Sequence, residues 1–205
     1  MSHPIKTLFL DIGGVLLTNG WDRKARQEAA KLFSLDYTDL EERHHLTYDT
    51  YESGKLDLDV YLDRIVFFEK RGFTKEQFRL FMTSQSQPYP ETIEYFKKLK
   101  KANSLQIGVV SNEGKELSEY RIRKFELNSW VDFFVVSSFV HLRKPDEDIY
   151  RLALGIAQVP AEKCAYADDR HLFVEVAQKL GIRSVHHTAL SNTSVEFEAM
   201  GLSAK

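Results

Sequence analysis

The 205-residue chain contains one cysteine, Cys164, which excludes an intramolecular disulfide and a zinc site built from several thiolates. No apolar run approaches the ~20 residues that cross a bilayer, so we expect no membrane partner. Neither sign of charge dominates: 28 basic and 30 acidic residues give a formal net charge of −2, which argues against a nucleic-acid partner. The N-terminal residues also lack the apolar core of a signal peptide. These absences favour a cytoplasmic protein with a buried, reduced cysteine.

The stretch Thr7–Leu16 joins an apolar run to one carboxylate and two glycines. Its apolar residues do not alternate with polar ones, which is typical of a strand buried on both faces of a parallel sheet. An ionised carboxylate is costly to bury without a partner, so we expect Asp11 at the strand's exit, facing a cleft. Gly13 and Gly14 permit a tight backbone and the close approach of a ligand. Taken alone, the stretch also fits an Asx turn before a glycine loop.

Residues 20 to about 88 show helical periodicity and no convincing strand. Thr38 and Glu41 have the spacing of a capping box at the start of one of four expected helices. Pro88 and Pro90 end the segment. The sequence therefore predicts a catalytic core formed by residues 1–18 and 89–205, with a helical cap formed by residues 19–88.

From Glu91 onward, helix and strand patterns alternate, as in βαβ units. Together with the first strand they predict an α/β fold: a doubly wound, five-stranded parallel sheet with strand order 3-2-1-4-5 or its mirror numbering. The later strands are expected at 105–110, 133–136, 164–167 and 183–186, and the helices at about 91–102, 115–127, 146–157, 172–180 and from about 194.

Polar residues follow four of these strands, either at the strand end or in the next loop. Ligands of doubly wound sheets bind beyond the carboxyl ends of the strands, so side chains far apart in the sequence meet there. Repetition of the pattern across strands is harder to explain by chance than any single motif. The residues are Asp11, Ser111, Asn112, Lys144, Asp168 and Asp169.

Two kinds of ligand suit this set. Asp11 would repel Asp168 or Asp169 unless a cation lay between them, and oxygen ligands of this kind suit Mg²⁺, with the Gly13 carbonyl able to join. The remaining groups are donors or cations and suit a phosphate with several oxygens. The chain has no GxxxxGK[ST] phosphate loop, so Asp11 is best interpreted as a nucleophile that attacks phosphorus.

The order of these motifs resembles that of the haloacid dehalogenase-like (HAD) hydrolases, and the helical insert resembles their C1 α-helical cap. The resemblance runs from about Lys6 to Gly201. Within the superfamily, the segments 53–55 and 142–146 and the Asp168-Asp169 pair resemble the small sugar-phosphate phosphatases, the group that includes α-D-glucose-1-phosphate phosphatase.

The resemblance implies a role for each position. Asp11 would form an aspartyl-phosphate intermediate. Ser111, helped by the Asn112 backbone, would hydrogen-bond the phosphoryl group. Lys144 would neutralise its charge and orient Asp11. The resemblance implies as metal ligands Asp11, the Gly13 carbonyl, Asp168 and Asp169, of which Asp169 aligns best with the metal-binding Asp of the fourth motif.

Two positions depart from the family's pattern. Gly13 stands where most phosphatases of the superfamily carry an Asp that protonates the leaving group, and Phe173 stands where a further Asp or Asn is common. We therefore expect either a leaving group that needs little protonation or an acid supplied elsewhere; general acid catalysis is worth about 10²–10⁴-fold. The candidate acids are His44, His45, Tyr48, Glu113, His141 and, most plausible by position, His171.

The sequence favours a Mg²⁺-dependent phosphatase acting on a small phosphorylated metabolite, possibly a sugar phosphate. A dehalogenase is the first alternative, and a binding or regulatory protein that has lost turnover is the second. Trp21 is expected either to line the substrate pocket or to pack as an anchor, and Arg143 either to contact phosphate or to form a salt bridge. The substrate and the oligomeric state are not given by the sequence.

Overall fold

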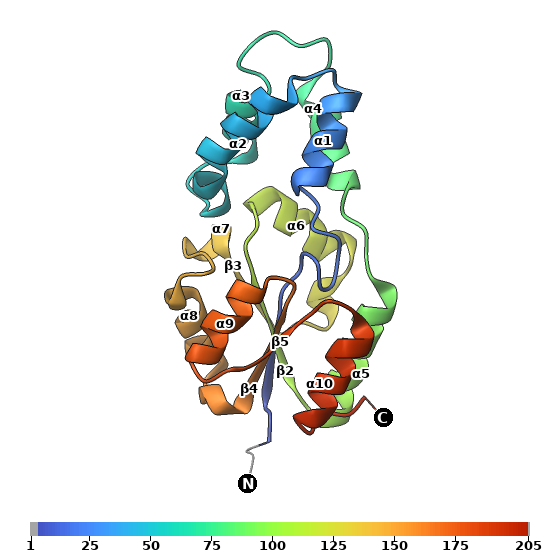
Figure 1. The fold of residues 1–205 in the computed structure, drawn as a ribbon, viewed down its shortest axis with the longest axis vertical. Coiled ribbons are helices and arrows are strands. Elements are labelled where there is room, and N and C mark those ends of the chain that lie inside the picture. The colour runs from blue at the N-terminus through green and yellow to red at the C-terminus, as the bar shows by residue number, and fades with distance from the viewer. Residues whose placement is uncertain (1–3, 205) are drawn as a thin grey trace.

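The computed structural model describes residues 4–204 and shows a five-stranded, all-parallel sheet covered by helices on both faces (Figure 1). The strand order β3-β2-β1-β4-β5 confirms the predicted doubly wound α/β fold and its 3-2-1-4-5 order. Residues 1–3 and 205 belong to the predicted core but lie outside the described residues. Residues 1–3 are also part of the N-terminal segment that was considered as a signal peptide. The strands are β1 Thr7–Leu10, β2 Gln106–Ser111, β3 Phe133–Val136, β4 Cys164–Asp168 and β5 Arg183–His186.

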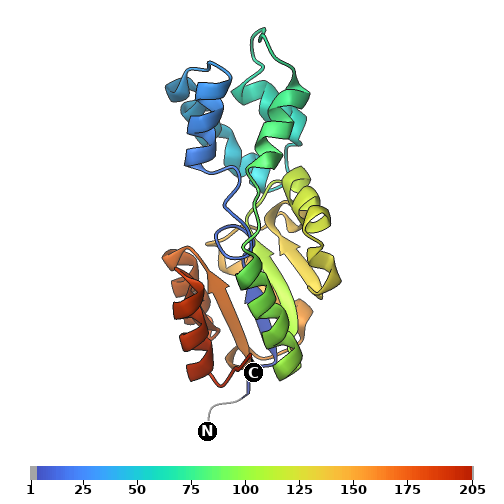
Figure 2. The same ribbon diagram turned by 90° about the vertical axis from the view of Figure 1, so that its right-hand side faces the viewer.

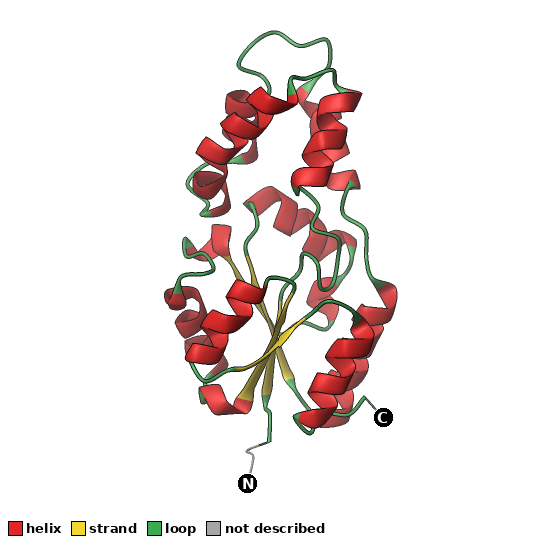
Figure 3. Ribbon diagram, in the orientation of Figure 1, coloured by secondary structure: helices red, strands yellow, loops and turns green. Residues whose placement is uncertain are grey.

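The central strand β1 is buried on both faces, as its unbroken apolar run predicts. Leu8 and Leu10 pack in one cluster with side chains of α5 and α10, while Phe9 packs in the other with side chains of α8 and α9. These two layers are visible on opposite sides of the sheet in Figure 3. The helices are α5 Pro90–Asn103, α6 Lys115–Lys124, α7 Ser137–Val140, α8 Glu147–Ala157, α9 His171–Lys179 and α10 Leu190–Ala199, with 3-10 turns at Leu127–Ser129 and Ala161–Lys163.

Most predicted bounds of the core elements lie within three residues of the observed ones, and two differences are larger. The last helix begins at Leu190, not near 194. The sequence did not mark this start, because the residue before it, Ala189, has no side chain that could cap the helix. The short helix α7 follows β3 in a stretch for which the sequence predicted no helix. Along the whole stretch from 4 to 204, no helix combines the length and the apolar character that crossing a bilayer requires.

Four helices between β1 and α5 form a separate layer beyond the carboxyl ends of the strands, which we call the helical unit (residues 23–84; Figure 2). The unit has its own apolar core, which includes the fully buried Tyr61, Leu62 and Phe78. Its helices are α1 Arg23–Leu32, α2 Tyr37–Glu52, α3 Leu58–Ile65 and α4 Lys75–Ser84.

The predicted capping box at Thr38 is wrong. Helix α2 is capped two residues earlier, by Asp36, whose side chain accepts the Asp39 N–H at 3.0 Å. Glu41 is not at the N3 position of this cap, and its carboxylate accepts from Arg26 of α1 instead. A complete capping box forms instead at α4, between Thr74 and Gln77.

Two linkers join the helical unit to the sheet, and they run side by side. Leu17 forms a β-bridge with Pro88, and the Thr18 N–H donates to the Gln87 carbonyl at 2.8 Å. The buried Arg121 of α6 donates to the Ser86 hydroxyl and to the Thr18 carbonyl, both at 3.0 Å, so it holds both linkers. The helical unit is therefore tied to the sheet at two adjacent crossings.

Candidate active site

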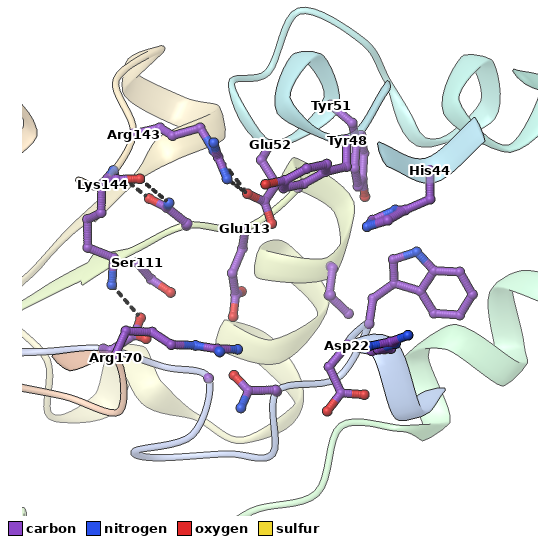
Figure 4. A pocket seen from close by; sticks show the side chains of 18 of the residues that line it. Asp22, His44, Tyr48, Tyr51, Glu52, Ser111, Glu113, Arg143, Lys144 and Arg170 are labelled. Carbon is purple, nitrogen blue, oxygen red and sulfur yellow. Dashed lines mark hydrogen bonds and ion pairs between the residues drawn. The ribbon is translucent and has the colours of Figure 1, made fainter. Parts of the chain in front are cut away.

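A cavity of about 600 Å³ lies between the carboxyl ends of the strands and the helical unit. Asp11, Ser111 and Lys144 line it from the sheet side, and His44 and Tyr48 of α2 line it from the helical unit (Figure 4). The crossover connections bring these side chains together although as many as 133 positions separate Asp11 from Lys144 in the chain. The convergence predicted from the strand ends therefore occurs in the fold.

Lys144 is the buried cation of the site. Its Nζ lies 2.6 Å from Asp168 Oδ2 and 3.1 Å from Asp11 Oδ1, and it donates to the Val110 carbonyl at 3.0 Å. Burial alone would lower the pKa of Lys144, but the two carboxylates outweigh burial and hold its pKa above the ordinary value. The lysine therefore stays charged and links the ends of β1 and β4.

Asp11 lies at the exit of β1 with its carboxylate largely buried. Its Oδ1 accepts the Ile12 N–H at 2.9 Å, in addition to the contact with Lys144. Burial raises the pKa of Asp11 to about 7, with Lys144 and a hydrogen bond from Ser111 opposing the shift and Asp168 adding to it. A second cation nearby would lower the pKa of Asp11 further and favour its ionised form.

The adjacent acids Asp168 and Asp169 have different surroundings. Asp168 is fully buried and both its oxygens are occupied: Oδ2 by Lys144 and the Tyr166 hydroxyl, and Oδ1 by the Arg170 N–H at 2.8 Å. Asp169 Oδ2 accepts from Asn19, while its Oδ1 is buried with no hydrogen-bond partner among residues 4–204. The arrangement makes Asp168 the partner of Lys144 and leaves Asp169 with an open ligand atom.

These acids fit a divalent cation. One carboxylate oxygen from each of Asp11, Asp168 and Asp169 lies within 4.8 Å of the others. Three carboxylates at this separation repel one another unless a cation or protons lie among them, and an all-oxygen donor set suits Mg²⁺. The orphaned Asp169 Oδ1 is a buried polar atom of the kind that a metal ion satisfies.

The Asn112 side chain hydrogen-bonds the backbone of Lys144. Its Nδ2 donates to the Lys144 carbonyl and its Oδ1 accepts the Lys144 N–H, both at 2.8 Å. These bonds fix the loop before Pro145 against the end of β2. A contact of Asn112 with substrate, as the sequence predicts, would therefore use the backbone and not the amide side chain.

The two departures from the family's pattern have structural counterparts. A Cβ at Gly13 would lie 2.8 Å from Asn19 Oδ1, so Asn19 occupies the space beside the glycine. The Phe173 ring lies 4.9 Å from Lys144 Nζ, in a cation–π contact, where a carboxylate or amide is common in the family. Asn19 was missed by the sequence reasoning; its only signal was a position in the linker just after the first strand.

Gly14 gives a test of the Asp169 position. Its φ is +74° and a Cβ there would lie 2.3 Å from Asp169 Oδ2, so we expect Gly14→Ala to cost about 1–2 kcal/mol and to displace the Asp169 carboxylate. Urea unfolding with and without Mg²⁺ checks both effects. Gly72→Ala is the matched control, because a Cβ at Gly72 meets nothing within 4 Å. Equal stability of the two variants would contradict the expected clash.

Four of the six candidate acids line the cavity: His44, His45, Tyr48 and Glu113. Glu113 is buried with one oxygen paired to Arg121 and the other accepting from Ser118 at 2.9 Å, so both of its oxygens are engaged by other side chains. The other two candidates lie outside the cavity lining. His141 Nδ1 contacts the Ser53 carbonyl at 2.8 Å, and His171 has a side chain 67% exposed beside Glu175.

The position of His171 leads to a simple expectation. Because its side chain is exposed and does not line the cavity, His171→Ala should leave the acidic limb of the pH–rate profile unchanged. The profile is recorded for the wild type and the variant with the same phosphate ester. A shift or loss of the acidic limb in the variant would restore His171 as the candidate acid.

The structure shows which contacts Arg143 and Trp21 make, for each of which the sequence left two alternatives. Arg143 donates to Glu52 Oε2 at 2.7 Å and lies 2.8 Å from Asp49 Oδ1, so it forms the salt-bridge arrangement and joins the Lys144 loop to α2. Trp21 combines its two expected roles. It lines the cavity, and it packs edge-on against Phe78 with the ring centroids 5.7 Å apart.

Comparisons with known proteins agree with this geometry. The sequence model of the haloacid dehalogenase-like hydrolases matches residues 5–181, and the chain therefore belongs to that family. No curated protein matches the chain. The family assignment confirms the superfamily resemblance seen in the motifs.

Solved structures share the fold at low sequence identity. A HAD family enzyme, BT-2542 from Bacteroides thetaiotaomicron, determined as a magnesium complex, is 21% identical with a TM-score of 0.80, over 95% of this chain and 99% of that one. A predicted HAD-like hydrolase from Porphyromonas gingivalis is 18% identical with a TM-score of 0.76, over 96% and 98%. The L-2-haloacid dehalogenase RSc1362 is 18% identical with a TM-score of 0.65, over 89% and 86%.

Proposed function

We propose that this chain is a Mg²⁺-dependent phosphatase that hydrolyses a small phosphorylated metabolite through an aspartyl-phosphate on Asp11. The observation that carries the proposal is the convergence of three carboxylates around one buried lysine, with Asp169 Oδ1 buried and unpartnered. Another structure of the Bacteroides enzyme holds magnesium and inorganic phosphate, which supports the same ligands here. The free, buried Cys164 is compatible with the cytoplasm, where we place the protein.

Asp11 and Asp169 would hold the metal ion, with the Gly13 carbonyl and, through its remaining lone pairs, Asp168 nearby. When bound, Mg²⁺ supplies charge neutralisation for the phosphate oxygens and for the crowded carboxylates. The same three acids and Gly13 are those expected from the sequence.

The chain's own residues divide the reaction between them. Asp11 Oδ1 is held by Ile12 and Lys144, so we assign Oδ2 to the attack on phosphorus. The new bond joins Oδ2 to phosphorus as the ester bond to the leaving group breaks, and the leaving oxygen takes the electron pair. Lys144 and the Ser111 hydroxyl offset the charge on the transferring group. Water then attacks phosphorus and releases phosphate and the Asp11 carboxylate.

The leaving oxygen needs a proton unless it is a good leaving group. Position 13 supplies none, and Glu113 is committed to Arg121 and Ser118. We therefore propose that the proton comes from solvent or that the natural leaving group needs little protonation. The helical unit would act as the cap over the substrate, with the boundaries 19–88 predicted from the sequence, and a sugar phosphate is the class of substrate that the motifs favour.

Release of inorganic phosphate tests the proposal directly. We expect p-nitrophenyl phosphate and at least one sugar phosphate to be hydrolysed with Mg²⁺ and not after chelation with EDTA. Halide release from a 2-haloacid without Mg²⁺ would favour the dehalogenase alternative, for which the L-2-haloacid dehalogenase fold is the supporting observation. Absence of both activities would favour the binding or regulatory alternative.

The pKa of Asp11 predicts how Mg²⁺ affects stability. In the metal-free protein the pKa is about 7, against an ordinary 3.8, so the folded state binds more protons and loses stability as pH rises from about 4 to 7. Mg²⁺ binds the deprotonated site, so its stabilisation should grow over the same interval. At a tenfold excess over its Kd it should add about 1.4 kcal/mol at pH 8. Urea unfolding at pH 5.5 and 8 measures this, and equal Mg²⁺ effects at both values would contradict it.

A further inference from the structure

Three side chains of the helical unit and its linker form a hydrogen-bonded chain that ends at the cavity. Trp21 Nε1 donates to the Tyr61 hydroxyl at 2.9 Å, and that hydroxyl lies 2.6 Å from His44 Nδ1. An indole N–H can only donate, so the Tyr61 oxygen accepts it and its own proton is left for His44. Because Tyr61 is fully buried, a proton without an acceptor would be costly there. His44 Nδ1 is therefore the acceptor.

A neutral imidazole that accepts at Nδ1 carries its proton on Nε2. Burial, followed by the Arg26 cation, lowers the pKa of His44 to about 3, with Glu41 opposing and His45 adding to the shift. The ring stacks on Tyr48, with centroids 4.9 Å apart and planes 24° apart, which fixes its orientation. His44 lines the cavity, so Nε2–H is a neutral donor fixed at its wall (Figure 4).

Two arginines of the cavity wall are paired with carboxylates, while Arg23 donates to the neutral Tyr37 hydroxyl. Arg26 is paired with Glu41, and Arg143 with Glu52. On the same face of α2, the Tyr51 hydroxyl is buried with no partner in the described part of the chain, which adds a second neutral donor. A substrate group that bears hydroxyl or ether oxygens complements such a wall better than a second anion does.

We infer that His44 is a specificity-determining residue that donates a hydrogen bond from Nε2 to an uncharged oxygen of the leaving group, as found in sugar and polyol phosphates. The substrate part of this inference rests on the proposed phosphatase function. The tautomer of His44 does not, because it follows from the contacts with Tyr61 and Trp21 alone.

The ring state is measured first, without any activity. In protein labelled with ¹⁵N-histidine, long-range ¹H–¹⁵N spectra separate the tautomers of the seven histidines, and the signals lost in His44→Gln assign His44. We expect the Nε2–H tautomer with no titration between pH 8 and 5. A proton on Nδ1, or protonation of the ring within that range, would overturn the inference.

Kinetics then test recognition. His44→Phe keeps the aromatic stack but removes the donor, so kcat/KM for the best sugar phosphate should fall about 5- to 10-fold, chiefly through KM. Phenyl phosphate, whose leaving group has no acceptor oxygen beyond the ester, should change less than 2-fold. His44→Gln, which places an amide N–H near the position of Nε2, should recover most of the loss. His171→Phe, on the exposed side of α9, is the matched control.

The outcomes separate the two proposals. If the wild type hydrolyses no phosphate ester, the proposed function fails while the tautomer measurement still stands. If the wild type is active but His44→Phe affects phenyl phosphate as much as the sugar phosphate, the recognition role of His44 is wrong. A preference of tenfold or more for a bisphosphate over the monophosphate would contradict the uncharged leaving group.

Discussion

Asp11→Asn should reduce phosphate release by a factor of about 10⁴ or more while the protein stays folded. The amide cannot attack phosphorus, and loss of a nucleophile removes the covalent route altogether. The fold should tolerate the change, because burial already disfavours the charged form of Asp11, as its raised pKa indicates. Steady-state hydrolysis and thermal unfolding measure the two effects on the same preparation.

Asp148→Asn is the matched control for this prediction, since Asp148 is exposed in the first turn of α8 and does not line the cavity. It should keep wild-type turnover. If Asp11→Asn retains even a tenth of the wild-type rate after deamidation is excluded by mass spectrometry, Asp11 is not the nucleophile.

Lys144→Met is expected to combine loss of activity with the largest loss of stability among these variants. Lys144 is almost fully buried, and its removal leaves Asp11 and Asp168 facing each other without their cation. Breaking a buried ion pair from one side costs about 3–5 kcal/mol. The cost should be greatest at pH 8 and smaller at pH 5, because protonation of Asp11, whose pKa is raised to about 7, relieves its repulsion with Asp168.

Urea unfolding at the two pH values measures the effect, and Mg²⁺ should recover part of the stability at pH 8. Lys115→Met, at an exposed position of α6, should stay within about 0.5 kcal/mol of the wild type. A Lys144→Met protein that is as stable as Lys115→Met at pH 8 would show that the lysine is not the counter-ion of the two acids.

Strand ends could be predicted from the sequence because they depend on local pattern. The apolar runs before Asp11, Ser111 and Asp168 are long enough to identify buried strands, and the rules for parallel sheets then bring their ends together. The strand order and the family follow from the same pattern and are confirmed. The metal, the nucleophile and the substrate remain proposals.

Side-chain partnerships could not be predicted in this way. Asp168 and Asp169 are adjacent in the sequence, and only packing shows that Asp168 faces Lys144 while Asp169 faces Asn19. The cap of α2 was assigned to Thr38 because several polar residues near its start can cap a helix, whereas in the structure Asp36 is the cap and Glu41 pairs with Arg26 of α1. Such choices depend on contacts between distant segments, which periodicity does not report.

The arginines illustrate the same limit. Arg121 has no motif around it, yet it is buried and contacts both linkers of the helical unit as well as Glu113. Arg143 stands next to Lys144 in the sequence, but its guanidinium turns to Glu52 of α2 and not to the lysine's carboxylates. Both positions become interpretable only when the helical unit is placed on the sheet.

The most direct test of the central claim is one turnover in H₂¹⁸O with excess protein and Mg²⁺, followed by mass spectrometry of phosphate and of the peptide containing Asp11. Attack of water on an aspartyl-phosphate places one ¹⁸O in the released phosphate and none in Asp11, which is the predicted result. Hydrolysis of an aspartyl ester at its carbonyl carbon, as in cleavage of a carbon–halogen bond, would place ¹⁸O in Asp11. Label in Asp11, or phosphate released at the same rate without Mg²⁺, would contradict the account.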